Sequence, residues 1–549
     1  EEYASGFDLP AKDCPKCGTL MIHEGNDMPF ATFLGFNADK VPDIDLNFSG
    51  EYQPKAHSFC REIFGVENTF RGGTIGTIAK KTAENYIADF YTKNEKMIRK
   101  CEIEVMTPYI QGIKRSTGQH PGGIVVVPKG VDINEVTPVQ YPADDITSDW
   151  KTTHIDYHKF EANLLKLDIL GHDDPTMIRF LMNFVEANPS EFPFDKIEDV
   201  PINDSEVLKM FSGVEVLNVT PEQIKSDIGS TGLPEFGTQL TKNMLTEIRP
   251  KTVSELIKIS GLSHGTDVWA GNARDYFLGI NGKSEKVPFD DLIGCRDDIM
   301  VRLIQKGVPA KHAFKIMESV RKGRGLSADH EAIMKKYEIE SWFIDCCKKI
   351  KYLFPKAHAT AYVIMALRIA WFKLYKPLYY YSGFFSKRVD AFEVQTLAGG
   401  YDAIVSRINE LSKYGKYANE DDLQESSGGE ETSSVKNAKL LVGLQVALEM
   451  VARGYTFKNV HVNKSHATDF IIEGNSLRIP FVAIDSFGAN TAKQLIQNRG
   501  DVPFTSIKDA TRRGHISNSL ADKLYLLGAF EGLPKEDEVG LFKYLSDTK

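Results

Sequence analysis

The sequence predicts an α+β protein of several domains, and three observations lead to this expectation. At 549 residues, with 42% hydrophobic and 26% charged residues, the chain is long enough to form several large cores. Short apolar runs bounded by Gly or Pro, which are typical of strands, occur before residue 174. From residue 174 to about residue 417, apolar residues recur at helical spacing.

Three segments are predicted to form strands. Val41–Phe48 alternates apolar and polar residues, which places Asp43 and Asp45 on one face of its strand. The other two segments are the apolar runs Gly123–Pro128 and Asn163–Leu170, each with a Gly or Pro near its boundary.

The remaining segments complete the expected order of elements. Between residues 57 and 113 the spacing of apolar residues is mostly helical. Residues 419–431 are rich in Ser, Gly and acidic residues, which is typical of a linker or loop. After this linker we expect a helix at residues 438–453, a short β-hairpin at residues 455–472 and short helices at residues 477–533.

The net charge of −9 argues against a uniformly basic nucleic-acid-binding protein. The charges are unevenly distributed, because residues 420–431 alone hold six acidic residues and no basic one. Residues 55–115 carry eleven Lys and Arg against seven Asp and Glu, a net charge of +4. Residues 296–324 carry eight Lys and Arg against three Asp and Glu, a net charge of +5. We therefore expect a segregated surface with distinct positive regions.

The cysteines and the apolar segments indicate a cytoplasmic protein. Seven cysteines scattered through the chain, with Cys346 and Cys347 adjacent, do not form a disulfide framework. The chain opens with acidic residues where a signal peptide would be basic, and it reads as part of a longer protein. The run Ala357–Lys373 is the most apolar, but Arg368 lies within it, so a buried helix explains it better than a membrane span.

Three aspartates could carry chemistry. Asp43 and Asp45 can hold one hard cation between them, although an exposed pair at a sheet edge explains the same spacing. Asp168 lies inside an apolar run, where a charge is costly unless it is paired, bound to metal or hydrogen-bonded to the backbone. Three carboxylates on adjacent strands would suit phosphoryl transfer assisted by two Mg²⁺ ions, which is the chemistry of polymerases and nucleases.

Two further features suit an enzyme that acts on nucleic acid. Several cations between residues 296 and 324 recur at near-helical intervals, and such a face suits a triphosphate or a nucleic-acid backbone; an ordinary solvated face is the alternative. Residues 477–499, with a tight turn at 484–490, resemble a helix-hairpin-helix, whose turn presents backbone N–H groups to a DNA phosphate. Ser486 stands where the first hairpin glycine is expected, and a plain helical hairpin is the alternative.

Cys14 and Cys17, followed by Gly18, have the spacing of a zinc knuckle. A complete site needs two more ligands, and no second cysteine pair follows at matching spacing. We expect a structural Zn²⁺ here with its remaining ligands upstream of Glu1, while a pair without a metal is the alternative.

Five stretches have to be considered together: Pro42–Phe48, Thr117–Gly123, Leu165–Pro175, Ile259–Trp269 and Phe354–His358. In this order they closely resemble the PolC-type replicative DNA polymerase III alpha subunit of Gram-positive bacteria, a C-family polymerase. The likeness extends over nearly the whole chain. It implies a palm of the polymerase-beta-like nucleotidyltransferase type, a mostly helical thumb and fingers, and a C-terminal helix-hairpin-helix domain that binds duplex DNA.

The resemblance also implies the domain boundaries. The expected order is the first part of the palm with the zinc knuckle at residues 1–50, the thumb at 51–114, the second part of the palm at 115–175, the fingers at 176–418, an acidic linker at 419–437, and the duplex-binding domain with the tail at 438–549. The proofreading exonuclease and other N-terminal domains of the family would lie before Glu1.

The resemblance assigns roles to individual residues. Asp43, Asp45 and Asp168 match the three catalytic ligands of the two Mg²⁺ ions. Lys166 lies two residues before Asp168, on the same strand face, and matches a lysine near the triphosphate. Further contacts to the dNTP are expected from Arg296, Arg321 and Lys322 in the fingers, from His264 in the nucleotide pocket, and from His358 near the incoming sugar. For His358, capping of the apolar helix is the alternative.

Other assignments concern DNA and partner proteins. Gly488, Asn490 and Lys493, in the hairpin turn and the start of the next helix, are expected to contact DNA. Leu541 and Phe542 stand where the family carries a sliding-clamp motif, although Glu538 replaces the usual first Gln. The expected partners are primer–template DNA, dNTPs, the sliding clamp and other replisome subunits, and no membrane.

The sequence thus predicts a DNA-templated DNA polymerase that uses two metal ions in chromosomal replication. A two-metal nuclease would use the same aspartates, and a non-catalytic DNA-binding scaffold would need only the hairpin and the cationic helices. Both remain alternatives.

Overall fold

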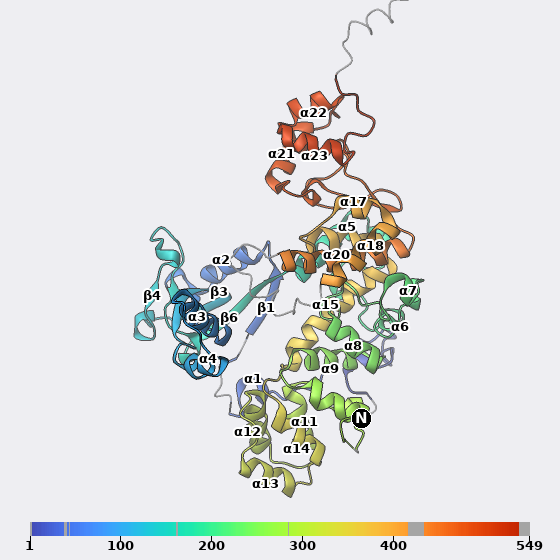
Figure 1. The fold of residues 1–549 in the computed structure, drawn as a ribbon. Helices are drawn as coiled ribbons and strands as arrows, with labels where there is room; N and C mark the ends of the chain where they lie inside the picture. The colour runs from blue at the N-terminus through green and yellow to red at the C-terminus, as the bar shows by residue number, and fades with distance from the viewer. Residues whose placement is uncertain are drawn as a thin grey trace, which may run out of the picture. The chain divides into compact units, whose positions relative to one another are not determined.

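The chain divides into two compact units in a computed structural model that describes residues 3–37, 41–42, 44–160, 163–283, 285–414 and 433–536 (Figure 1). The sheet unit is Pro29–Thr176, and the helical unit comprises Glu1–Met28 with Met177–Lys549. Among the residues described, no helix is long and apolar enough to cross a membrane.

The sheet unit contains one six-stranded mixed sheet with the strand order β1-β6-β3-β2-β5-β4. β1 and β6 are parallel, whereas β3 is antiparallel to both β6 and β2. The elements in chain order are α1 (Ala31–Leu34), β1 (Ile44–Ser49), α2 (Gln53–Phe64), β2 (Thr69–Thr77), α3 (Lys80–Lys93), α4 (Lys100–Met106), β3 (Lys114–Val126), β4 (Val139–Gln140), β5 (Thr152–Thr153) and β6 (Leu165–His172).

The predicted strands are confirmed as β1, β3 and β6, but β3 begins nine residues earlier than expected, at Lys114. The expectation of mostly helical structure between residues 57 and 113 is wrong for residues 69–77, which form β2. Its glycines permit close packing, since a Cβ at Gly73 would lie 1.9 Å from the carbonyl oxygen of Thr153.

Both faces of the central strands are buried. On one face Ile124 of β3 packs with Leu167 and Ile169 of β6 against Ala56 and Cys60 of α2. On the other face, the buried cluster consists of Phe70, Val125, Val127, Ile133, Phe160 and Leu164. Successive residues of β3 thus point to opposite cores, as the pleat requires.

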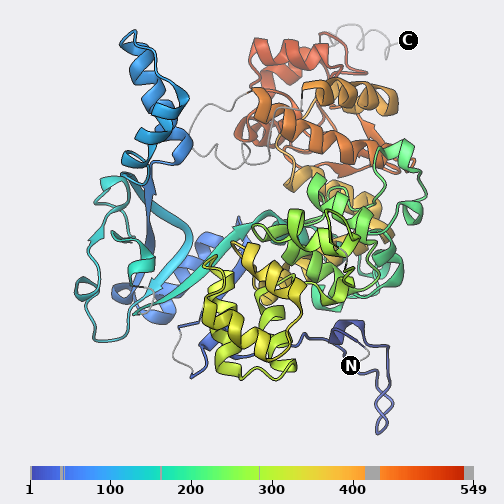
Figure 2. The same cartoon turned by 60° about the horizontal axis from the view of Figure 1, so that its bottom comes forward.

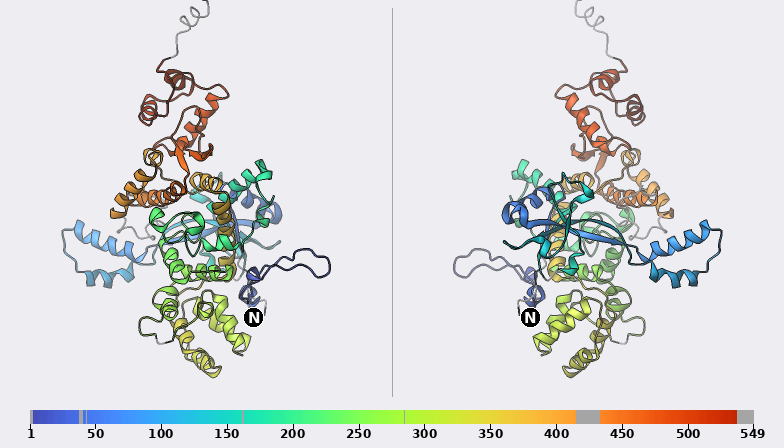
Figure 3. Two further views of the ribbon diagram at one scale, coloured as in Figure 1. Left: turned by 90° about the vertical axis from the view of Figure 1, so that its right-hand side faces the viewer. Right: turned by 90° about the vertical axis from the view of Figure 1, so that its left-hand side faces the viewer.

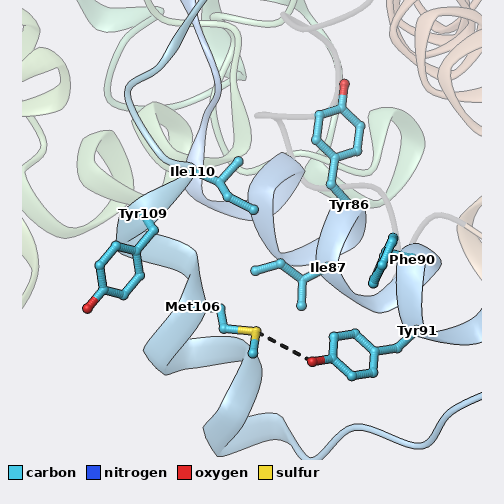
Figure 4. A pocket seen from close by; sticks show the side chains of 7 residues that line it. All are labelled: Tyr86, Ile87, Phe90, Tyr91, Met106, Tyr109 and Ile110. Carbon is cyan, nitrogen blue, oxygen red and sulfur yellow. Dashed lines mark hydrogen bonds between the residues drawn. The ribbon is translucent and has the colours of Figure 1, made fainter.

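Helices α3 and α4 lie at the far end of the β2–β3 ribbon (Figures 2 and 3). They enclose an open apolar hollow of about 490 Å³ (Figure 4), lined by Tyr86, Ile87, Phe90, Tyr91, Met106, Tyr109 and Ile110. The Tyr91 hydroxyl donates a weak hydrogen bond to the Met106 sulfur at 4.0 Å. This lining contains no carboxylate, imidazole or thiol, and its polar groups are the hydroxyls of Tyr86, Tyr91 and Tyr109.

The helical unit has α9 and α15 packed together near its centre. α15 is buried around most of its surface, as the apolar run predicted. The helices up to residue 414 are α5 (Asp173–Ala187), α6 (Ser205–Lys209), α7 (Pro221–Ile224), α8 (Gln239–Ile248), α9 (Val253–His264), α10 (Arg274–Leu278), α11 (Arg296–Gln305), α12 (Ala310–Arg321), α13 (Ala328–Lys336), α14 (Ser341–Lys349), α15 (Lys356–Tyr375), α16 (Pro377–Lys387), α17 (Val394–Ala398) and α18 (Gly400–Tyr414).

A buried ion pair connects α15 to α20 (Ser433–Ala452). The Lys373 ammonium and the Glu449 carboxylate are 2.9 Å apart, and both side chains are almost completely inaccessible to solvent. Lys373 also donates hydrogen bonds to the carbonyl oxygens of Gly229 and Thr231, and the Tyr381 hydroxyl donates to Glu449. Burial lowers the pKa of Lys373 to about 8, although Glu449 acts in the opposite direction.

The C-terminal part combines a small sheet with three helices. The sheet has the order β7-β9-β8, and its strands are β7 (Thr456–Lys458), β8 (Ile471–Ile472) and β9 (Ser476–Arg478). A hairpin joins β8 to β9, whereas β7 pairs in parallel with β9, so the hairpin predicted within residues 455–472 is wrong. The helices are α21 (Ala489–Arg499), α22 (Ile507–Arg513) and α23 (Asn518–Leu526).

Candidate functional site

Two of the predicted aspartates lie directly opposite one another in the sheet unit. Asp45 of β1 is in register with Asp168 of β6, and the two strands are parallel. Residues paired in this way project from the same face of a sheet, so both carboxylates lie on one face. Asp43 lies outside the described residues.

Asp168 has an oxygen atom that no protein group satisfies. The residue is 8% exposed, and its Oδ2 forms an ion pair with the Lys166 ammonium at 2.8 Å. Its Oδ1 is buried without a hydrogen-bond partner, and no described backbone N–H donates to this side chain. The structure thus gives no support to a backbone-bonded aspartate. A buried carboxylate oxygen with unused acceptor capacity fits a hard cation such as Mg²⁺.

Within the described ranges, no group of three or more His, Cys, Asp or Glu side chains is placed to hold a metal ion. The described carboxylates of the predicted site are therefore the pair Asp45 and Asp168. The ammonium group of Lys166, the predicted triphosphate contact, binds Asp168 and lies 4.8 Å from the centre of the Tyr157 ring.

His120 is a neighbour of Asp168 to which the sequence assigned no role. Its Nδ1 lies 3.8 Å from the Asp168 Oδ1. His120 belongs to an irregular part of β3, because the register with β2 shifts between Arg71 and Gly73. Burial lowers the pKa of His120, and the nearby cations Lys166 and Arg71 lower it further, although Asp168 opposes them.

Arg71 and His57 form a chain of hydrogen bonds that joins this bend to β6. Arg71 donates hydrogen bonds to the carbonyl oxygens of His120 and Pro121, at 3.1 and 3.3 Å. Its other terminal nitrogen bonds the Nδ1 of His57, whose Nε2 donates to the carbonyl oxygen of Ile169 in β6. Burial lowers the pKa of His57, which favours the neutral ring that this chain of bonds requires.

The helical unit brings several predicted nucleotide contacts together around Phe354. The Arg296 N–H donates to the Phe354 carbonyl oxygen at 3.0 Å, and the Leu353 N–H donates to the Arg321 carbonyl oxygen at 3.4 Å. The ring of His264 stacks on Phe354 with 4.9 Å between centroids, and the His358 ring lies edge-on to Phe354 at 4.6 Å. Residues far apart in sequence thus meet at one segment.

The cations of this cluster differ in their state of pairing. Arg296 is 8% exposed, and its Nε is buried without a hydrogen-bond partner. A buried guanidinium with an unused donor suits an anionic ligand. Arg321 instead forms two hydrogen bonds with the Glu318 carboxylate, and the Lys322 ammonium lies 3.8 Å from the same carboxylate.

Glu235 is a neighbour of His264 that sequence reasoning missed. Its Oε2 lies 3.2 Å from the His264 Nε2, while the His264 Nδ1 donates to the Ser260 carbonyl oxygen at 2.8 Å. Glu235 has a φ of 64°, an uncommon conformation for a residue with a side chain. No motif in the sequence marks this position, because its role depends on a loop that returns to α9.

The predicted hairpin residues lie at the start of α21. Gly488 is the N-cap of this helix, and Asn490 and Lys493 are exposed on its first turns. Ser486, which replaces the expected glycine, takes a φ of 66°. The turn before α23 has the same pattern, with His515 at a φ of 52° two residues before the N-cap Ser517. Two similar hairpin turns therefore follow one another.

Replacing Ser486 by glycine should stabilise the protein. Glycine adopts a left-handed backbone conformation without the penalty from a Cβ atom, so we expect a gain of about 1 kcal/mol in unfolding free energy. Denaturant unfolding measures this change. Ser517→Gly is the matched control, because Ser517 has a φ of −65° and caps α23 through its hydroxyl, so this variant should lose stability. A loss of stability in Ser486→Gly would contradict the expectation.

The remaining predicted sites are only partly described. Cys14 and Cys17 lie in a turn closed by the hydrogen bond from the Gly18 N–H to the Cys14 carbonyl oxygen. The Thr19 hydroxyl and backbone lower the pKa of the Cys17 thiol, which is fully exposed. No third ligand accompanies this pair in the described part of the chain. Leu541 and Phe542 lie outside the described residues.

Three family descriptions match separate parts of the chain. Residues 21–107 and 88–171 match the bacterial DNA polymerase III alpha NTPase domain, and residues 174–340 match the bacterial DNA polymerase III alpha subunit finger domain. Residues 454–538 match a helix-hairpin-helix motif, which supports the hairpin expectation.

Curated proteins named DNA polymerase III PolC-type align with nearly the whole chain. The protein of Oceanobacillus iheyensis is 48% identical over 539 residues, and that of Bacillus subtilis is 48% identical over 538 residues. The protein of Pediococcus pentosaceus is 47% identical over 541 residues. Each alignment covers 98% of this chain and 36% of the relative, so the chain spans about a third of the length of these relatives. The chain belongs to the PolC-type DNA polymerase III family.

Proposed function

We propose that the chain carries the polymerase part of a replicative DNA polymerase, which transfers a nucleotidyl group from a dNTP to a primer 3′-hydroxyl on a DNA template. The observation that carries this proposal is the in-register pair Asp45 and Asp168 beside Lys166, in a chain of this family. Carboxylates on one sheet face, next to a cation that can bind phosphate, suit phosphoryl transfer.

The carboxylates are the proposed ligands of Mg²⁺. Asp43, Asp45 and Asp168 would hold the ions, and the unpartnered Oδ1 of Asp168 supports this assignment. Two Mg²⁺ ions, when bound, would favour the deprotonated primer hydroxyl and neutralise the charge that develops on the pyrophosphate. Lys166 keeps the Asp168 carboxylate in place and has two further N–H groups for a phosphate oxygen.

The cluster around Phe354 is the proposed site of further dNTP contacts. Arg296, Arg321 and Lys322 would bind phosphate oxygens, and Arg296 has the strongest support because its buried Nε is unpartnered. His264 would line the nucleotide pocket, and His358 would lie near the sugar. Arg321 and Lys322 would share their charge between the nucleotide and Glu318.

The two hairpin turns are proposed to bind the backbone of duplex DNA. Exposed N–H groups at the start of α21, with Gly488, Asn490 and Lys493, would contact phosphates without reading the base sequence. The proposed palm comprises residues 1–50 and 115–175. The proposed thumb is residues 51–114, and the proposed fingers are residues 176–418. Zn²⁺ at Cys14 and Cys17, a sliding clamp at Leu541 and Phe542, and contacts with other replisome subunits complete the proposal.

Primer extension tests the proposed function. The chain is incubated with Mg²⁺, the four dNTPs and a labelled primer annealed to a longer template, and elongation of the primer is expected. Incubation of the chain with the same duplex and Mg²⁺ but without dNTPs distinguishes a polymerase from a nuclease. A nuclease shortens the primer, whereas a polymerase leaves it intact. A chain that binds the duplex but neither extends nor shortens it would favour the DNA-binding scaffold and contradict the proposal.

A further inference from the structure

His120 is held by its own chain in one orientation. Its Nδ1 accepts hydrogen bonds from the backbone N–H groups of Gly123 and Gly122, at 2.6 and 3.2 Å. An imidazole nitrogen that accepts two N–H bonds carries no proton, so the proton of the neutral ring is on Nε2. The local backbone thus fixes the tautomer, and Nε2 is a hydrogen-bond donor.

The two glycines are required by this arrangement. A Cβ at Gly123 would lie 2.9 Å from the His120 Nδ1 and 3.0 Å from its Cγ, which would displace the ring. A Cβ at Gly122 would lie 2.5 Å from Leu170 and 2.8 Å from the Ile169 carbonyl oxygen, so it would push β3 away from β6. The sequence His120-Pro121-Gly122-Gly123 therefore holds the imidazole ring in one position.

The Nε2 donor of this ring has no hydrogen-bond partner among the described residues. No described group accepts a hydrogen bond from Nε2, although the side chain is only 32% exposed. The ring lies beside Asp168, since its Nδ1 is 3.8 Å from the Asp168 Oδ1 and Gly123 is in register with Asp168 across the sheet. Arg71 donates hydrogen bonds to the carbonyl oxygens of His120 and Pro121, which holds the backbone that carries the ring.

We propose that His120 is a substrate-binding residue whose Nε2–H donates a hydrogen bond to a phosphate oxygen of the nucleotide substrate beside Asp168. This inference rests on the proposed polymerase function. The phosphate oxygen belongs either to the dNTP or to the terminal phosphodiester of the primer, since both present the same anionic acceptor. A neutral donor suits this place because it adds a bond to phosphate without adding a charge that would repel the metal ions.

Two substitutions test the Nε2 donor of His120 separately from its Nδ1 acceptor. His120→Asn places an amide oxygen where it can accept from Gly122 and Gly123, but it lacks the reach of Nε2. His120→Gln restores an N–H donor near the position of Nε2. We expect His120→Asn to bind its phosphate ligand about 10-fold more weakly, the value of one hydrogen bond to a charged group, and His120→Gln to recover most of this loss.

The measurements use the 549-residue chain with Mn²⁺ in place of Mg²⁺. Mn²⁺ binding is followed by electron paramagnetic resonance, and binding of dATP and of primer–template DNA is measured separately at saturating Mn²⁺. A loss confined to dATP identifies the dNTP as the source of the phosphate, and a loss confined to the DNA identifies the primer. His154→Gln is the control. His154 directly follows β5, and β2 and β3 lie between β5 and the Asp168 strand β6 in the sheet.

A double substitution provides an independent test. Gly123→Ala should weaken phosphate binding as His120→Asn does, because the added methyl group displaces the ring. The two changes combined should be no worse than either alone, since both remove the same contact.

The outcomes distinguish this inference from the proposed function. If His120→Asn binds Mn²⁺, dATP and DNA as the unaltered chain does, the inference is wrong and the proposed function stands. If His120→Asn loses Mn²⁺ as well, the ring only positions Asp168 and the inference is wrong. If the unaltered chain binds neither Mn²⁺ nor dATP, the proposed function fails with it. A loss of phosphate binding alone, recovered by His120→Gln, supports the inference.

Discussion

Asp168→Asn should abolish primer extension while leaving duplex DNA binding intact. The substitution keeps the shape of the side chain but removes the charge that we propose as a metal ligand. Asp168 has one oxygen without a protein partner and another that binds Lys166, so the change affects both the metal and the lysine proposed to bind phosphate. We expect a loss of at least about 1,000-fold in the extension rate, equivalent to about 4 kcal/mol.

The measurement is single-turnover extension of a labelled primer, with gel shift of the same duplex as the binding assay. Asp149→Asn is the matched control, because Asp149 is an exposed carboxylate of the same unit, and its extension rate should be unchanged. Equal thermal unfolding of the three proteins would show that the sheet is intact. Extension by Asp168→Asn within about 10-fold of the unaltered rate would mean that this carboxylate does not serve the chemistry.

Glu449→Gln should destabilise the helical unit more than any surface substitution. Lys373 would lose its carboxylate partner in a site that is almost completely closed to solvent. Its ammonium would either remain charged without a counterion or lose its proton, and both outcomes cost free energy. Removing one member of a buried ion pair typically costs about 3 to 5 kcal/mol. Tryptophan fluorescence during urea unfolding suits the measurement, because Trp269, Trp342 and Trp371 lie in the helical unit and only Trp150 lies in the sheet unit.

Two comparisons give this result its meaning. Glu186→Gln breaks the exposed pair of Arg179 and Glu186 and should change the unfolding free energy by less than about 1 kcal/mol. Replacing Lys373 and Glu449 together by methionine should restore part of the loss, because both buried charges disappear while the carbonyl oxygens of Gly229 and Thr231 lose their donor. An unfolding midpoint for Glu449→Gln equal to that of the unaltered chain would show that the pair does not stabilise this core.

The strands that the sequence predicts best are those whose pattern is set by burial. β6 places Leu167 and Ile169 in the core against α2, and β1 alternates because Ile44 and Phe48 pack on the same core while Asp45 lies on the other face. The first half of β3 escaped prediction because Lys114–Gln119 is exposed and polar. β2 escaped because its glycines have low strand propensity, although they allow close contact with the Thr153 backbone.

The candidate site shows the same division. Asp45 and Asp168 were selected because charged residues at strand spacing are conspicuous in an apolar or alternating run, whereas Lys166 was assigned through the family resemblance. His120 and Glu235 were not found, because their positions depend on a bend in β3 and on a returning loop, and neither leaves a periodic signal. The contacts around Phe354 join segments that are far apart in sequence, so spacing alone could not bring them together.

The parallel pairing of β1 with β6 has a consequence for how the site tolerates change. Neighbouring strands lie about 4.8 Å apart in every sheet, and paired metal ions in phosphoryl transfer lie about 3.5 to 4 Å apart. The spacing between the Cα atoms of Asp45 and Asp168 is therefore fixed by backbone hydrogen bonds, and side-chain substitutions elsewhere should not change it. Only a slip of register would defeat it, since moving β1 by one residue would turn Asp45 to the opposite face of the sheet.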